Sequence, residues 1–258
     1  MSPIREHTVT EDVGLARNGC LAALSRPALA LLEPQLSEVT LPLGAVLWNE
    51  DEPAQHVYFP LSGFVSILMP MRDGSAIEVG SAGQQAVAGS LLQVDPTEAL
   101  TVGQVQIGGQ FSRIATNRLL AAAAANEEIG RLVGFARDWI LLQAQQLVAC
   151  TALHTGDQRF CRWLWHCHQA MQASPLPLPL PLPLTQEQIA GLLGIRRTTV
   201  SFIAQAMHNA GAIDYRRGKI SICDPERLKA AACECCRRLD ETYWPSVRLA
   251  SHRPLIRS

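Results

Sequence analysis

The sequence predicts an α+β protein with an N-terminal β-roll, a long helix and a C-terminal winged helix-turn-helix. Three patterns predict this fold. Short apolar runs between turn residues occupy residues 36–116, which is typical of a compact antiparallel roll or barrel. A helical pattern continues over 117–155, and two short amphipathic helices with a basic hairpin lie within 156–224. Residues 1–35 are predicted as a leader, and 225–258 as a C-terminal helix and tail.

The composition is that of a globular chain, with 48% hydrophobic and 17% charged residues among 258. The net charge of −1 is unevenly distributed. Residues 185–258 hold 12 Lys and Arg against 7 Asp and Glu, or +5, whereas the remainder holds 10 against 16, or −6. This division favours an acidic sensing part joined to a basic part with an anionic partner.

The eight cysteines occur without a secretory signal, which indicates a reducing, cytoplasmic environment. Arg17, Arg26 and Pro27 interrupt the most apolar N-terminal stretch well short of the about 20 residues that span a membrane. We therefore expect a cytoplasmic protein with no membrane partner.

The leader carries a predicted helix from Gly19 to Leu32, broken or kinked near Pro27. In the predicted β-roll, Asp73-Gly74 is the clearest hairpin turn, because it lies between two apolar runs. The runs predicted as strands are LPLGAVLW from Leu41, HVYFPL from His56, FVSILMP from Phe64, IEVGS from Ile77 and TVGQVQI from Thr101.

The helical pattern from Asn117 to His154 has apolar residues at heptad spacing on one face and a second apolar stripe on an adjacent face. One stripe could pack on the β-roll while the other meets a partner helix, or both could form one wide stripe buried within a single chain. The heptad positions, predicted as a dimer interface, are Val133, Ala136, Ile140, Gln143, Leu147 and Cys150. The adjacent stripe consists of Leu132, Phe135, Trp139 and Leu142.

A further helix is predicted from Asp157 to Met171, followed by five Pro-Leu pairs over Pro175–Leu184. Alternating proline removes every second amide donor and forbids a helix, so this stretch is predicted as a stiff, extended connector. A ligand for a proline-binding module is the alternative interpretation.

The stretch from Leu184 to Asp224 is the most informative part of the chain. Thr185 and Gln188 have the spacing of a capping box, so a first helix begins there, and Gly194 ends it. A second helix is predicted from Arg197 to Asn209, with a polar and basic outer face. Two helices joined by a short turn form the pattern in which the second helix enters the major groove of DNA.

A basic hairpin follows this second helix. Ile213–Tyr215 and Lys219–Cys223 are predicted as strands around the turn at Arg216-Arg217-Gly218, which makes a winged helix with a basic tip. The alternative interpretation is an ordinary α+β core that binds no DNA. The order of cap, turn, helix and wing favours DNA binding.

Three stretches resemble the Crp/Fnr family of bacterial transcription regulators. They are VYFPLSGFVSI at Val57–Ile67, DQRFCRWLW from Asp157, and LTQEQIAGLLGIRRTTVSFI from Leu184, of which the last is the most specific. The resemblance implies a cyclic-nucleotide-binding-like β-roll sensor and a long dimerisation helix. It also implies a homodimer that binds a two-fold symmetric operator in double-stranded DNA, with RNA polymerase as a further partner.

The side chains predicted to contact DNA come from the second helix and the wing. Arg197, Thr198, Ser201 and Phe202 match the family's base-reading positions, and Phe202 stands where relatives often have Arg. Phe202 is expected either to touch a thymine methyl or to pack against the neighbouring helix. The full predicted set is Arg196, Arg197, Thr198, Thr199, Ser201, Phe202, Gln205, Arg216, Arg217 and Lys219.

The predicted effector pocket departs from that of cyclic-nucleotide-binding relatives, which grip the ribose and phosphate with a Gly-Glu pair and an Arg. Here Gly89-Ser90 falls at the Gly-Glu position, and Glu98 or Leu100 falls at the Arg position. No Lys or Arg lies between Arg72 and Arg113, so the phosphate would lose its bidentate partner. We therefore expect that cyclic AMP is not the effector.

Cofactor chemistry is left undetermined. Cys235 and Cys236, predicted on one helix with Cys233, would point about 100° apart, so no metal site is predicted and their role is left open. Relatives that hold an iron–sulfur cluster use several N-terminal cysteines, and only Cys20 lies there. Haem remains open, with His56, His154 and Cys150 as candidate ligands.

The sequence lacks the common catalytic signatures, including GxSxG, the P-loop and HExxH, so we do not expect an enzyme. The second hypothesis for function is a regulatory or protein-interaction module in which the helix-turn-helix is merely structural.

Overall fold

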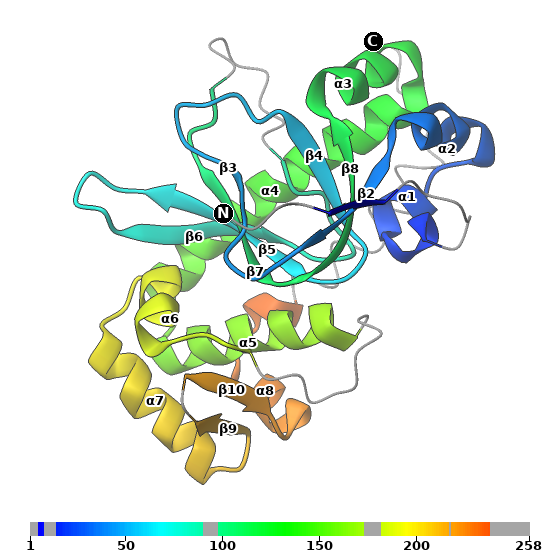
Figure 1. Ribbon diagram of the computed structural model, residues 1–258. Helices are drawn as coiled ribbons and strands as arrows, with labels where there is room; N and C mark the ends of the chain where they lie inside the picture. The colour runs from blue at the N-terminus through cyan, green and yellow to red at the C-terminus, as the bar shows by residue number, and fades with distance from the viewer. Residues whose placement is uncertain (1–4, 8–13, 90–97, 173–181, 217, 238–258) are drawn as a thin grey trace.

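The computed structural model describes residues 5–7, 14–89, 98–172, 182–216 and 218–237. Two four-stranded antiparallel sheets make up a β-roll, and a helical unit with a two-stranded hairpin lies against one end of it (Figure 1). The predicted α+β architecture of roll, long helix and C-terminal helix-turn-helix is confirmed.

The roll consists of one sheet in the order β1-β2-β8-β4 and a second in the order β3-β7-β5-β6. The strands of the first sheet are β1 (Arg5–His7), β2 (Ser37–Leu41), β8 (Gly109–Ala115) and β4 (His56–Pro60). Those of the second are β3 (Val46–Trp48), β7 (Val102–Ile107), β5 (Phe64–Pro70) and β6 (Ala76–Ala82). Buried Val65, Ile67 and Phe111 from facing sheets fill the interior of the roll.

The predicted strands are largely confirmed, with two differences. The run from Leu41 to Trp48 is not one strand, because Gly44 adopts φ +80° and turns the chain between β2 and β3. The prediction also missed β1, β2 apart from Leu41, and β8, although β8 pairs with both β2 and β4. The Asp73-Gly74 hairpin is confirmed: Gly74 has φ +82°, and the Met71 amide donates to the Ser75 carbonyl at 2.8 Å.

The predicted leader helix is broken, as expected near Pro27. It consists of α1 (Gly19–Ala22) and α2 (Arg26–Leu32), flanked by the 3-10 turns η1 (Leu15–Arg17) and η2 (Glu33–Gln35). The Ser25 hydroxyl caps α2 by accepting from the Ala28 amide, and Pro27 lies in the first turn, where a missing amide costs nothing.

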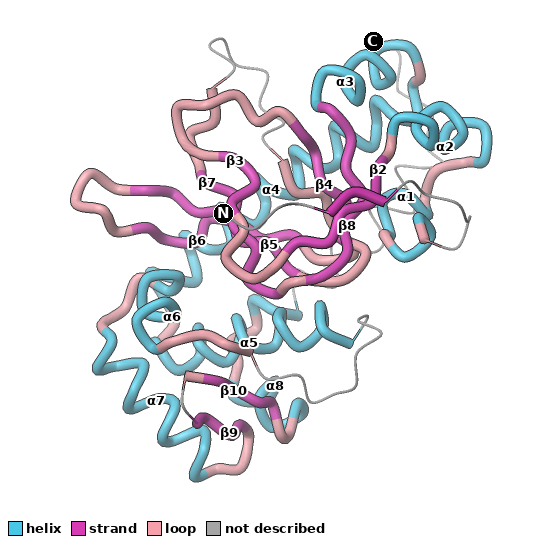
Figure 2. The backbone as a smooth tube through the Cα atoms, in the orientation of Figure 1, coloured by secondary structure: helices cyan, strands magenta, loops and turns pink. Residues whose placement is uncertain are grey.

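The helical pattern from Asn117 to His154 is likewise two helices, α3 (Thr116–Ala125) and α4 (Glu127–Leu153). Asn126 separates them because its backbone is extended and its side chain accepts from the amides of Glu128 and Ile129, which starts a new helix. Helix α4 passes along the roll and leads into the C-terminal unit (Figure 2).

The C-terminal unit is built around α5, whose Phe160, Trp163 and Leu164 are fully buried. Its elements are α5 (Gly156–Gln172), α6 (Gln186–Leu193), α7 (Arg197–Asn209), β9 (Ile213–Arg216), β10 (Lys219–Ile222) and α8 (Pro225–Ala231). The predicted C-terminal helix begins at Pro225 but is interrupted, because Ala232 takes an extended backbone and ends α8 at Ala231.

Most of the predicted proline-leucine connector, Pro175–Leu184, lies outside the described residues. Its described end joins the wing: Leu182 and Ile220 exchange two backbone hydrogen bonds of 2.7 and 2.9 Å. The chain thus enters the helix-turn-helix beside β10.

Candidate nucleic-acid interface

Helix α6 forms as its local sequence predicts. The Thr185 hydroxyl accepts from the Gln188 amide at 3.2 Å, and the Gln188 side chain accepts from the Thr185 amide at 2.9 Å. Gly194 ends the helix at φ +60°, a left-handed conformation that glycine adopts without steric cost. This cap and stop determine where the turn to α7 begins.

Helix α7 packs on α5 and α6 through Val200, Ile203 and Ala204, all buried, while Met207 is half-buried. Its opposite face is exposed. The exposed members of the predicted DNA-contacting set on and before α7 are Arg196, Arg197, Thr198, Thr199, Phe202 and Gln205. The structure therefore brings these side chains to one polar end and face of a short helix.

Ser201 and Phe202 differ in how far they reach solvent. Ser201 is half-buried, and its hydroxyl donates to the Gln186 side chain on α6. The Phe202 side chain is 77% exposed, which is inconsistent with packing against the neighbouring helix. Of the two interpretations of Phe202, only a contact outside this chain fits its position.

Arg197 lies at the first turn of α7, where the amides and the helix dipole already favour an anion. Its Nε is 3.9 Å from Oε2 of Glu187, and both side chains are largely exposed. Such an exposed ion pair is weak, about 0–1 kcal/mol, so it leaves the guanidinium available to a phosphate or a base.

The wing is the hairpin of β9 and β10, which pair from Ile213–Ile222 to Arg216–Lys219. Gly218 adopts φ +72° in its turn. Exposed Lys219 stands at the tip, whereas the Nε of Arg216 is 3.0 Å from an Asp214 carboxylate oxygen. Arg217 lies outside the described residues.

The first turn of α7 lies beside the hairpin of β5 and β6. A groove there is lined by Met71, Ser75, Ala76, Ile77, Glu187, Ala190, Gly191, Gly194, Ile195, Arg196 and Arg197. At Gly194 a Cβ would lie only 2.8 Å from Cδ1 of Ile77. The β-roll thus contacts the helix-turn-helix at the glycine of its turn.

The residues of the predicted effector pocket lie in different structural environments. Gly89 is buried against β4, where a Cβ would be 3.3 Å from the Cα of Val57. Glu98 is exposed and forms an isolated bridge with Pro53. Ser90 lies outside the described residues.

The structure corrects the predicted dimer stripe on α4. Val133, Ala136, Gln143 and Cys150 are buried within the chain. Gln143 shows the reason: its side chain accepts from the Ser81 amide at 3.0 Å and donates to the Ser81 carbonyl at 3.0 Å, so this face packs on β6.

Ile140 and Leu147 of the same stripe are only partly exposed, and Ile140 packs against the interior of the roll. The exposed side of α4 carries other apolar side chains. They are Leu141 at 58%, Val148 at 71% and Leu153 at 78% exposure.

The candidate haem ligands do not form one site. His56, at the start of β4, lies 6.2 Å from the Tyr58 ring between ring centroids. His154 and Cys150 lie at the end of α4, together with Cys233 and Cys235. Sequence reasoning missed this grouping, although Cys150-x3-His154 and Cys233-x-Cys235 are each a spacing that brings two ligands together.

Two thiols of this group share a hydrogen bond, with 3.6 Å between Sγ of Cys150 and Sγ of Cys233. This hydrogen bond lowers the pKa of Cys233, against the opposing effect of burial. The same hydrogen bond and burial raise the pKa of Cys150 above its usual value.

The comparisons with known proteins agree with this architecture. Residues 158–231 match the family model of the Crp-like helix-turn-helix domain. Among solved structures, a transcriptional regulator of the Crp/Fnr family from Eubacterium rectale is similar with a TM-score of 0.62 at 14% identity, over 83% of this chain and 98% of that one.

FixK2 from Bradyrhizobium japonicum is similar with a TM-score of 0.61 at 18% identity, over 77% of this chain and 98% of that one. The regulator CLP of Xanthomonas campestris, described as responsive to c-di-GMP, is similar with a TM-score of 0.59 at 16% identity, over 77% of this chain and 99% of that one. The chain has the fold of Crp/Fnr-type transcription regulators and carries their helix-turn-helix domain.

A search for similar curated proteins and a search for membrane-spanning helices were both negative. No curated protein sequence matches the chain. Among the described residues, no helix is both long enough and apolar enough to cross a membrane.

Proposed function

We propose that the protein is a sequence-specific DNA-binding transcription regulator that acts as a homodimer on a two-fold symmetric operator. The observation that carries this proposal is the exposed end of α7, where Arg197, Thr198 and Phe202 project from a helix whose other face is buried. Phe202 is 77% exposed, so its ring is accessible to a partner outside the chain. Its place on a helix of this type fits contact with a thymine methyl in the major groove.

The role of each side chain on this surface is assigned from its charge and its hydrogen-bonding groups. Arg197 and Thr198 are assigned to base edges, because a guanidinium can bond a guanine at two points and a hydroxyl can bond either base type. Arg196, Arg216, Arg217 and Lys219 are assigned to phosphates, which position the protein without reading sequence. The basic surplus of the C-terminal part supports the same partner.

The homodimer is proposed through the exposed face of α4 that carries Leu141 and Val148, in place of the buried stripe. Leu141 and Val148 are seven residues apart, so they lie on the same side of the helix. Two copies joined there would present two α7 helices to successive major grooves about one DNA turn apart.

The β-roll is proposed as a sensor that does not bind cyclic AMP, since Gly89 packs against β4 and no basic residue lies between Arg72 and Arg113. RNA polymerase as a partner, a cytoplasmic location and the absence of enzymatic activity belong to the same proposal. CLP has a similar fold, but its response to c-di-GMP is a property of that protein and is not proposed for this chain.

The test is selection of bound duplexes from a random pool, followed by fluorescence anisotropy with the selected sequence over a salt series. A regulator should bind the selected duplex more tightly than mixed-sequence DNA, with affinity that falls steeply as salt rises. A protein-interaction module with a merely structural helix-turn-helix should bind neither duplex, and that outcome would overturn the proposal.

A further inference from the structure

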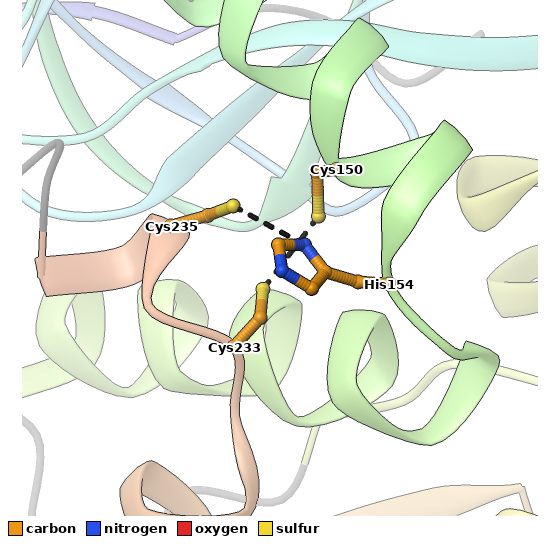
Figure 3. A group of neighbouring side chains, drawn as sticks. All are labelled: Cys150, His154, Cys233 and Cys235. Atoms are coloured by element: carbon orange, nitrogen blue, oxygen red, sulfur yellow. Dashed lines mark hydrogen bonds between the residues drawn. The ribbon is translucent and has the colours of Figure 1, made fainter.

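Four potential metal ligands meet where α4 ends. Cys150 belongs to the last turns of α4, His154 follows that helix, and Cys233 and Cys235 come from the segment after α8 (Figure 3). Their ligand atoms all lie within 4.8 Å of one another. The three cysteines are buried and the histidine is half-buried, so the group is shielded from bulk water.

Two of the distances between these atoms match those around a single tetrahedral ion. Zinc binds thiolate sulfur at about 2.3 Å and imidazole nitrogen at about 2.0–2.1 Å, so tetrahedral geometry places two sulfurs about 3.7 Å apart and sulfur and nitrogen about 3.5 Å apart. Sγ of Cys150 and Sγ of Cys233 are 3.6 Å apart, and Sγ of Cys235 is 3.5 Å from Nδ1 of His154.

Local structure explains why the two members of each pair of ligands lie close together. Cys150 and His154 are four residues apart at a helix end and so lie on one side of it. Cys233 and Cys235 converge because α8 stops at Ala231. The predicted divergence concerned Cys235 and Cys236, and it does not prevent Cys235 from meeting Cys233, which lies outside any helix.

The side chains around the group indicate which of these residues would bind a metal ion and which would not. Nε2 of His154 lies 3.1 Å from Oε2 of Glu234, which orients Nδ1 toward the thiols, as outer-shell carboxylates do for zinc-bound histidines. The Gln146 amide donates to Sγ of Cys235 at 3.0 Å. Cys236 is turned away, since its thiol donates to the Cys233 carbonyl at 3.1 Å.

A nearby cation offsets part of the charge of the group. Three thiolates, a neutral imidazole and a dication leave one negative charge, and the Glu234 carboxylate beside His154 adds a second. The buried guanidinium of Arg162 interacts electrostatically with Cys150 and Cys233 and offsets one of these charges. Its Nε has no hydrogen-bond partner within the described part of the chain.

We propose that Cys150, His154, Cys233 and Cys235 form a mononuclear zinc site. Zinc fits better than harder dications because thiolate and imidazole are its preferred ligands, and four protein ligands make a closed, structural site. The ion would join the segment after α8 to the junction of α4 and α5, where the long helix passes into the helix-turn-helix unit. The proposal does not depend on DNA binding.

The test begins with the full-length protein purified under reducing, anaerobic conditions. Metal analysis should find one zinc per chain, and replacement by Co²⁺ should give the intense visible absorption of a tetrahedral thiolate site. His154→Gln and Cys235→Ser should each lose the stoichiometric metal, whereas Cys223→Ser, at an exposed cysteine elsewhere, should retain it. Cys236→Ser should also retain it, which tests the assignment of the non-ligand beside the site.

Circular dichroism of each variant separates loss of metal from loss of fold, and the cobalt spectrum of the unmodified protein needs no variant. Two outcomes would overturn the proposal. One is an unmodified protein that neither holds zinc nor gives the tetrahedral cobalt spectrum. The other is full zinc content in folded His154→Gln and Cys235→Ser proteins. A Cys150–Cys233 disulfide found by mass spectrometry in place of metal would assign the group to redox chemistry and count as the first outcome.

Discussion

The indole Nε1 of Trp163 donates a hydrogen bond of 3.0 Å to Oε2 of Glu78. Trp163 lies on α5 of the helix-turn-helix unit and Glu78 on β6 of the β-roll, so this buried bond joins the two parts of the chain. The Ser66 hydroxyl donates to the same carboxylate. Burial raises the pKa of Glu78 above its usual value, against the lowering effect of these two donors.

The Glu78 carboxyl should make the stability of the protein depend on pH. Because its pKa is raised in the folded state, the native protein holds this proton more tightly than the unfolded chain. The stability that this proton gives to the folded protein is fully present below the pKa of Glu78 in the unfolded chain. It is lost as the pH rises through the pKa of Glu78 in the folded protein. Glu78→Gln should remove this dependence while keeping an acceptor for Trp163.

The measurement is urea unfolding of both proteins at several pH values, from about pH 4 to about pH 8. The difference in unfolding free energy should move in favour of the Gln variant as the pH rises. A difference that stays constant across this range would show that Glu78 does not titrate differently on folding.

The contact between Gly194 and Ile77 should make the turn of the helix-turn-helix sensitive to a methyl group. Gly194→Ala forces alanine into a left-handed backbone, which costs roughly 1–2 kcal/mol, and also drives its Cβ against Ile77. Gly211→Ala is the matched control, because Gly211 has φ +74° but nothing within 4 Å of its Cβ. Thermal melts should show a larger loss for Gly194→Ala. Equal losses of thermal stability in the two variants would mean that contact with Ile77 of the β-roll does not restrict the turn.

The exposed face of α4 should hold two copies together. Leu141→Glu places a charge on this face, so it should shift the protein from dimer to the 28.1 kDa monomer and weaken operator binding with it. Light scattering measures the mass. Leu31→Glu, at an apolar residue of α2 that is 50% exposed, is the control and should remain dimeric. A dimer that survives Leu141→Glu would place the interface elsewhere.

Arg197 and Lys219 should differ in what they contribute to DNA binding. Arg197→Ala should weaken binding to the operator by about 1–3 kcal/mol and affect mixed-sequence DNA far less, since it removes a base contact. Lys219→Ala should weaken both alike and flatten the salt dependence by about one unit, since it removes a phosphate contact. Anisotropy titrations on both duplexes measure this. Equal losses on both duplexes for Arg197→Ala would mean that the recognition surface is misassigned.

The β-roll should not bind cyclic AMP or cyclic GMP at micromolar concentration. The phosphodiester would lack a guanidinium from the stretch between Arg72 and Arg113, and a buried phosphate without one is costly. Isothermal calorimetry on the purified protein is the measurement. Micromolar binding would mean that a basic group from elsewhere in the chain or from a second subunit reaches the phosphate.

Features that depend on neighbours in the chain could be predicted from the sequence alone. The capping box of Thr185 and Gln188, the stop at Gly194 and the Asp73-Gly74 turn follow from local hydrogen bonds and backbone preferences, and the structure contains them all. The face of α7 that is buried could be predicted from the helical spacing of its apolar residues. These local rules sufficed to predict the fold class and to locate the candidate DNA-contacting face.

Only the tertiary structure decided which apolar face of α4 is buried. Both predicted stripes satisfied helical periodicity, and both face the chain itself, as in the alternative of one wide buried stripe. Gln143 bonds the backbone of Ser81 on β6, and Trp139 packs against the core of the roll. The meeting of Cys150 and His154 with Cys233 and Cys235 was equally beyond local rules. It requires α8 to end at Ala231 and the following segment to return to α4, and such long-range contacts arise from the packing of the whole core rather than from the sequence around each residue.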